Sequence, residues 1–170
     1  MHELINNNLP EVLAIRDIFY NCDKSRNGLE AIEAWVNSMS TAYKDCPYEI
    51  FHSFADGMYT REIHIKAGDI IVGKIHKKEY FINMLKGKGW IISEHGCKEV
   101  IAPCRFTAKA GAKHIGFFVE NTVWTDTSRT EATNIEDAEK DIFADSYEEL
   151  DEYMNTIDTH SDRGLLCQAG

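Results

Sequence analysis

Between Tyr59 and Ser128 the sequence adopts a two-residue period, and this feature constrains the fold more than any other. Apolar and polar residues alternate in short segments separated by glycine-containing turns, a pattern typical of half-buried β-strands. The predicted strands are MYTREIHI, IIVGKIH, EYFINML, GWIISEH, KEVIAP, FTAKA, HIGFFVE and TVWTDTS. Short strands in this arrangement predict a β-sandwich or a small barrel. No strand–helix–strand alternation or glycine-rich phosphate loop accompanies them, so a nucleotide-binding α/β fold is disfavoured.

Helical periodicity replaces this pattern on the N-terminal side. Pro10 suits the first position of a helix, and EVLAIRDIFYNC after it places its apolar residues on one stripe. A second helix is predicted from about Leu29 to Tyr43. We expect the two helices to form a hairpin on the outside of the barrel or on a partner. Their apolar stripes are then ordinary core surface or, as the alternative, an oligomer interface.

The net charge of −10 lies almost entirely in the C-terminal part of the chain. Residues 131–162 hold twelve acidic residues against Lys140 alone, so the remainder is close to neutral. Within this segment Asn134 can cap the helix IEDAEKDIF, and Ser146 with Glu149 forms a capping-box start for YEELDEYMNTI. A near-neutral body argues against nucleic-acid binding. The acidic helices are expected to be a solvated surface, with docking to a basic partner or mimicry of DNA as alternatives.

These patterns divide the chain into three predicted parts. They are an N-terminal helical extension over residues 1–50, a β-barrel over residues 51–130 and an acidic helical extension over residues 131–170. The apolar runs are too short to cross a bilayer, and the N-terminus lacks the order of a signal peptide, so a soluble protein is expected. Five cysteines without CxxC spacing fit neither a disulfide framework nor a thiolate zinc site, which favours a reducing cytosol.

Four segments carry a family resemblance: FADGMYTREI, GKIHK, APCRFTAKAGAKH and NTVWT. Through them, residues 51–142 resemble the small cupin-like proteins found in tailed-bacteriophage genomes. The resemblance implies a mainly β fold, a cupin jelly roll or double-stranded β-helix, between an N-terminal helical hairpin and acidic C-terminal helices. It also implies a phage-encoded protein of the host cytoplasm or of a virion. A homodimer or higher homo-oligomer is expected, with a phage or host protein as a further partner through the helices and acidic tail.

Cupin motifs place metal ligands at fixed distances from turn glycines, and here the set implied by the resemblance is incomplete. Counted back from Gly87, Tyr80 stands where a carboxylate is expected, His76 at the second histidine and Lys74 at the first. In the second motif His114 keeps the histidine position after a glycine turn. A catalytic zinc, iron or manganese site needs three protein ligands, and a lysine ammonium would repel the ion.

Two other arrangements stay open. A register shifted by two residues pairs His76 with Lys78 and puts Asn83 at the acid position, which supplies no better ligand set. In MYTREIHI, Glu62 and His64 share one face, and they could join the motif histidines if that face points inward. The opposite face carries Tyr59, Arg61, Ile63 and Ile65. This second face is the more apolar, so we expect it to be the buried one.

The candidate residues of a ligand pocket are therefore His76, Tyr80, Lys74, His114, Glu62 and Trp124. The candidate ligands for one divalent metal ion are His76, His114 and His64. Each has a structural alternative. His76 can be a core histidine bound to a backbone carbonyl or a tyrosine, His114 can make a rim hydrogen bond, and Trp124 can be core.

Three functions fit these residues. We favour a non-catalytic module that binds a small ligand or supports protein assembly, since the metal-ligand set is incomplete. The second is a metal-dependent cupin enzyme of isomerase or oxygenase type. The third is a phage anti-defence effector that binds a host nucleotide signal or a host protein. In that case Lys74, Arg105, Lys109 and Lys113 would contact the anion.

Overall fold

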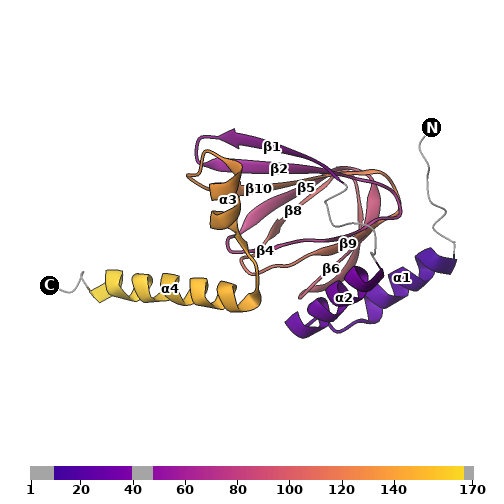
Figure 1. The fold of residues 1–170 in the computed structure, drawn as a ribbon, viewed down its shortest axis with the longest axis horizontal. Coiled ribbons are helices and arrows are strands. Elements are labelled where there is room, and N and C mark those ends of the chain that lie inside the picture. Colours follow the sequence, from indigo (N-terminus) through magenta and orange to yellow (C-terminus); the bar gives the residue numbers. More distant parts are fainter. Residues whose placement is uncertain (1–9, 40–47, 167–170) are drawn as a thin grey trace.

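Two antiparallel sheets face each other around the core in this computed structural model (Figure 1). It describes residues 10–39 and 48–166, with side chains as far as residue 157. The first sheet has the order β1-β2-β10-β5-β8 and contains β1 (Glu49–Ala55), β2 (Met58–Ile65), β10 (Thr122–Arg129), β5 (Tyr80–Lys86) and β8 (Cys104–Ala108). The second has the order β3-β9-β6-β7 and contains β3 (Ile70–Val72), β9 (Ile115–Phe118), β6 (Lys88–Ser93) and β7 (Gly96–Ile101).

The path of the chain between these sheets defines a jelly roll. It crosses from one sheet to the other between β2 and β3, between β3 and β5 by way of β4, between β5 and β6, and at each step from β7 to β8, β9 and β10. Each sheet therefore interleaves strands from distant parts of the sequence, as β10 does between β2 and β5. This is the double-stranded β-helix of cupins. The predicted fold class is confirmed, with helices at both ends of the described chain.

The N-terminal helices cover the outer face of the second sheet. Helix α1 (Pro10–Asn21) and helix α2 (Arg26–Met39) share one buried cluster with β6 and β9, in which Phe19 packs against Phe117. Lys113, which is buried, forms an ion pair with Glu33 of α2. The second sheet is thus covered on both faces, which explains why all four residues of β9 are buried. The predicted extension of the second helix over residues 40–43 lies outside the described residues.

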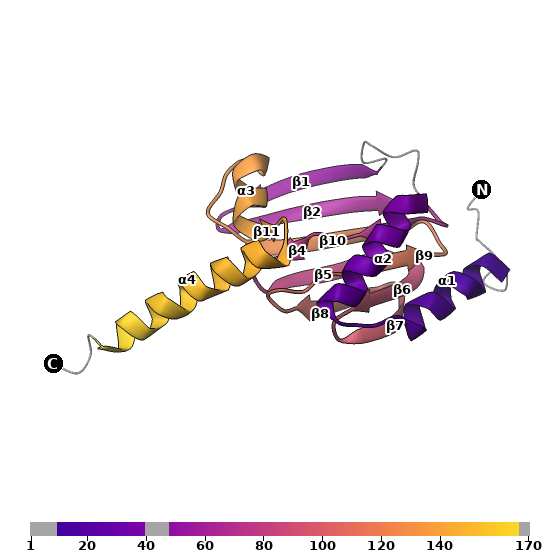
Figure 2. The same ribbon diagram turned by 60° about the horizontal axis from the view of Figure 1, so that its bottom comes forward.

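The C-terminal segment closes one end of the barrel. Helix α3 (Ile135–Ile142) begins at the predicted cap, because Asn134 Oδ1 accepts a 3.0 Å hydrogen bond from the Asp137 amide. Phe143 was predicted within this helix, but it lies in the two-residue strand β11 (Phe143–Ala144), which pairs with β4 (Ile75–His76). Helix α4 (Tyr147–Leu166) starts with the predicted Ser146 cap and extends away from the body in Figure 2.

Part of the acidic segment binds the chain's own lysines. The ion pairs join Lys74 to Glu139 (3.1 Å), Lys77 to Glu149 (2.6 Å) and Lys78 to Asp141 (2.6 Å). Lys74 precedes β4, and Lys77 and Lys78 follow it, so the acidic segment neutralises the basic residues that flank this strand. The sequence pattern did not associate these lysines with the acidic segment. Among the described residues, no helix is long and apolar enough to cross a membrane.

Two strands differ from the sequence prediction for local reasons. Strand β1 was not predicted, because it is an edge strand that leaves most of its side chains exposed and therefore lacks a clear apolar alternation. The segment IIVGKIH is two strands, β3 and β4, separated at Gly73. There the Gly73 amide donates a 2.8 Å hydrogen bond to the His114 carbonyl, and a Cβ at Gly73 would lie 2.8 Å from that oxygen.

Gly87, in the turn between β5 and β6, and Gly96, the first residue of β7 after the turn from β6, both have positive φ. Comparing them tests the packing around Gly87. Gly87 (φ 104°) would place a Cβ 2.8 Å from Thr122 Cα, whereas Gly96 (φ 118°) has open space around it. Gly96→Ala should cost about 1 kcal/mol of unfolding free energy, from backbone strain alone. Gly87→Ala should cost about 2–4 kcal/mol, because the clash adds to the strain. Urea denaturation of both variants checks this, and equal losses would contradict the packing at Thr122.

Candidate functional site

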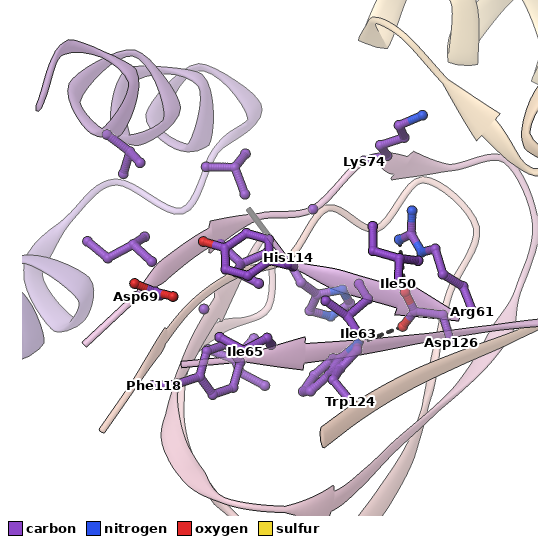
Figure 3. A pocket seen from close by; sticks show the side chains of 18 of the residues that line it. Ile50, Arg61, Ile63, Ile65, Asp69, Lys74, His114, Phe118, Trp124 and Asp126 are labelled. Atoms are coloured by element: carbon purple, nitrogen blue, oxygen red, sulfur yellow. Dashed lines mark hydrogen bonds and ion pairs between the residues drawn. The ribbon is translucent and has the colours of Figure 1, made fainter. Parts of the chain in front are cut away.

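A cavity of about 740 Å³ lies within the jelly roll (Figure 3). Its volume falls in the usual range for small-molecule pockets. The apolar wall is formed by Ile50, Ile63, Ile65, Ile71, Ile91 and Phe118. The polar groups include Arg61, His76, Tyr80, His114 and Asp126. Residues of the last turn of α2 complete the lining, so the N-terminal helices contribute to the site.

The orientation of β2 decides which candidates reach this cavity. Arg61, Ile63 and Ile65 are buried and point inward, as expected for the more apolar face of β2. Glu62 and His64 therefore lie on the opposite face, outside the cavity, where His64 Nε2 and Glu62 Oε1 are 2.7 Å apart. Of the candidate residues, Glu62 and His64 therefore do not line this cavity, because the pleat of the strand separates both side chains from the interior. His76, Tyr80, Lys74, His114 and Trp124 all line the cavity.

His76 is a buried, uncharged group at the polar end of the cavity. Its ring stacks on Tyr80, with 3.5 Å between centroids and 6° between planes, and it meets the edge of Phe143 at 4.7 Å. Its Nδ1 atom is buried without a hydrogen-bond partner among the described residues. Burial lowers the pKa of His76 well below 6.5, and the nearby charges of Arg61 and His114 act in the same direction. The imidazole is therefore neutral at physiological pH.

Tyr80 and His114 form a second uncharged pair. The Tyr80 hydroxyl lies 3.0 Å from His114 Nδ1. Burial raises the pKa of Tyr80 well above 10, so the phenol keeps its proton. Burial lowers the pKa of His114 to about 4, and the charges of Lys98 and His95 contribute. This hydrogen bond gives His114 a structural partner inside the barrel.

The strongest electrostatic feature of the cavity is an ion pair that the sequence did not reveal. Arg61 Nη2 lies 3.1 Å from Asp126 Oδ2, and both side chains are more than nine-tenths buried. Trp124 Nε1 donates to Asp126 Oδ1 at 2.7 Å, which places the predicted Trp124 in this cluster. Burial raises the pKa of Asp126, while Arg61 acts to lower it. The pairing of Asp126 with Arg61 across β10 and β2 depends on strand register, which alternation alone does not give.

The residues present do not fit a metal centre with three protein ligands. Nowhere in the described part of the chain do three or more His, Cys, Asp or Glu side chains gather in such a group. His76 and His114 are separately engaged with Tyr80, and His64 lies outside the cavity. Lys74 stands at the rim, where its ammonium binds Glu139. Two histidines fall short of the donor set that catalytic zinc or iron requires.

The four cations expected to hold a nucleotide do not converge on one site. Lys74 lines the large cavity, and Lys109 binds Glu79 at 2.5 Å beside a smaller cavity. Lys113 is buried against α2, and Arg105 is exposed on β8. Phosphate recognition needs several donors around one anion. The geometry does not provide such a cluster from these residues.

Fold and site together define a cupin-type jelly roll with a ligand-sized cavity. No family model matches the sequence, and no curated protein matches it. Among solved structures, an acetylacetone dioxygenase from Acinetobacter johnsonii is 23% identical, covers 48% of this chain and has a TM-score of 0.40. The match spans 58% of the dioxygenase chain, so this chain corresponds to little more than half of that protein.

Two further structural neighbours match over most of their own length. A cupin domain from Bordetella pertussis is 11% identical, with 52% of this chain and 99% of that chain covered and a TM-score of 0.41. An uncharacterized conserved protein with a double-stranded β-helix domain from Klebsiella pneumoniae is 12% identical, with 58% and 90% covered and a TM-score of 0.45. Similarities of this size assign no activity to this chain.

Proposed function

We propose that this chain is a phage-encoded cupin-fold protein that binds a small organic ligand inside its barrel without catalysing a reaction. The observation that supports binding is the cavity of about 740 Å³, which combines an apolar wall with a few buried polar groups. Ligand pockets of globular proteins have this composition, since apolar walls supply affinity and a few polar groups fix orientation.

The protonation behaviour of the polar groups favours binding over catalysis. A general acid or base works best when its pKa lies near the working pH. The pKa values of His76 and His114 lie far below neutrality and that of Tyr80 lies far above it. Asp126 is held in an ion pair with Arg61. None of these four groups is poised to exchange a proton at neutral pH, and the donors present do not fit a catalytic metal.

The phage origin in this proposal rests on the sequence resemblance of residues 51–142. The proposal includes a location in the host cytoplasm or in a particle assembled there. The proposal includes a homodimer or higher homo-oligomer, with α4 available for a phage or host partner, because this helix extends from the body and leaves Met154 and Ile157 exposed.

Native mass spectrometry of the full-length protein tests the proposed function. We expect spectra with a retained small molecule and no stoichiometric metal. Ile71→Trp should remove the retained mass, because Ile71 lines the cavity and is partly exposed to it, so the indole would occupy the ligand volume. Ile101→Trp is the matched control, since Ile101 is exposed on β7 and its replacement should leave the retained mass unchanged.

Two results would contradict this function. One is an equal amount of the same small molecule on the Ile71→Trp variant, which would place binding outside the cavity. The other is one divalent ion per chain in the wild type that is lost in His76→Ala and His114→Ala variants. That result would establish a two-histidine metal site and favour the enzyme alternative.

A further inference from the structure

The described residues that line the cavity carry unequal numbers of positive and negative charges. Arg61 is paired with Asp126 and Lys74 with Glu139, each at 3.1 Å, so both cations are neutralised. Asp69 also lines the cavity, directly before β3, and it forms no ion pair with any described residue. Because the two histidines of the cavity are neutral, the described residues of its lining carry one more negative charge than positive charge.

Partial burial disfavours the charged form of the Asp69 carboxyl group, which has no ion-pair partner among the described residues. The residue is partly buried, and burial raises the pKa of its carboxyl group. The backbone and charge of Lys66 act in the opposite direction, but Lys66 makes no ion pair with it among the contacts of the described chain. A cation placed beside a desolvated carboxylate stabilises the charged form. Within this cavity, a bound cation would therefore be stabilised most beside Asp69.

The last described turn of α2 adds no positive charge to this lining. Val36, Asn37 and Met39 of this turn line the same cavity, and the turn contains no basic residue. The described part of α2 therefore places no positive charge beside Asp69.

The wall between Asp69 and the Arg61–Asp126 pair is largely apolar, with the neutral His114 as a polar group within it. Figure 3 shows Asp69 at one side of the pocket and Arg61 with Asp126 at the other, with Ile65, Phe118 and Trp124 between them. Aromatic faces also attract organic cations. A ligand that matches these surfaces has a positive group at one end and an apolar body.

We infer that the cavity binds a small organic ammonium ion, with its ammonium group at Asp69 and its apolar body along Ile65, Phe118 and Trp124. This inference rests on the ligand-binding function proposed above and specifies the chemical class of the ligand. It favours a cation over an anion, because Arg61 and Lys74 are each paired with a carboxylate, whereas Asp69 has no ion-pair partner among the described residues. The buried Arg61 Nε has no hydrogen-bond partner in the described part of the chain and remains as a donor for a neutral acceptor on the ligand.

Isothermal titration calorimetry with three probes of similar shape tests the inference at neutral pH. The probes are phenethylamine, which is a cation, phenethyl alcohol, which is neutral, and hydrocinnamate, which is an anion. We expect the amine to bind wild-type protein at least about tenfold more tightly than the alcohol, a gain expected from one partly buried ion pair. Hydrocinnamate should bind most weakly.

Two aspartate variants separate the cavity charge from the overall charge. Asp69→Asn should reduce amine binding to the level of the alcohol, and a far-UV circular dichroism spectrum equal to that of the wild type shows that the variant is folded. Asp56→Asn removes the same charge from the exposed turn between β1 and β2 and should retain the preference for the amine.

Equal binding of amine and alcohol to the wild type would overturn the inference, and so would a preference for hydrocinnamate or an Asp69→Asn variant that keeps the amine preference. Binding of none of the three probes would also overturn it. The proposed function fails separately, when native spectra show no retained molecule or one that Ile71→Trp does not displace.

Discussion

Replacement of Arg61 by methionine should lower the free energy of unfolding by about 3–5 kcal/mol, the usual cost of removing one partner from a buried ion pair. Asp126 would remain as a buried carboxylate, with the Trp124 indole as its one side-chain donor among the described residues. Methionine occupies similar volume, so the loss would report charge and hydrogen bonding more than packing. Urea denaturation at neutral pH measures the effect, and an unchanged slope with denaturant would show that the unfolded state is comparable.

The double variant Arg61→Met with Asp126→Asn tests the cause of this loss. Asparagine keeps an oxygen that can accept the hydrogen bond from Trp124 and removes the charge, so much of the lost stability should return. Lys140→Met, which breaks the exposed pair with Glu136, serves as a control and should cost less than about 1 kcal/mol. If Arg61→Met cost no more than this control, the pair would not be desolvated as the structure shows.

The strands were predictable where burial alternates and not where tertiary context overrides the pattern. Strand β2 was predicted with its observed bounds, Met58–Ile65, because one of its faces is covered and the other is not. Strand β1 was not predicted, because an exposed edge strand shows little alternation of apolar and polar residues. Phe143 continues the helical periodicity of α3, but its backbone pairs with His76, which is 67 residues earlier by chain numbering. Such a long-range pairing leaves no local signal.

The residues of the candidate site also fall into two groups, those that the sequence could identify and those that only the structure identifies. His76, Tyr80 and His114 could be proposed from the cupin motif positions that the family resemblance implies, and the structure brings them together around one phenol ring. The Arg61–Asp126 pair could not, because it depends on the register between β2 and β10. Asp69 was missed because an aspartate after a turn glycine reads as ordinary turn chemistry. Its place in the cavity becomes visible only when the two sheets and α2 are assembled.

Acidification should destabilise the protein between about pH 6.5 and pH 4.5, because two buried histidines are neutral in the folded state. In the unfolded chain a histidine binds a proton below about pH 6.5. The folded-state pKa of His114 is about 4 and that of His76 lies well below 6.5, so in this window the unfolded state holds more protons. Stability from these groups is therefore complete above pH 6.5 and falls as the pH falls, by up to about 1.4 kcal/mol per pH unit for each histidine.

Replacing each histidine by a residue that does not titrate tests whether His76 and His114 cause this dependence of the unfolding free energy on pH. His76→Phe keeps the ring that stacks on Tyr80 and removes the unpartnered Nδ1, so its stability at neutral pH should be equal or higher. His114→Asn keeps a polar partner for the Tyr80 hydroxyl. Each single variant should lose about half of the slope in unfolding free energy between pH 6.5 and 4.5, and the double variant most of it. The carboxylates are the same in all four proteins, so their titration cancels in the comparison. Parallel stability curves for all four would show that neither histidine is held neutral by burial.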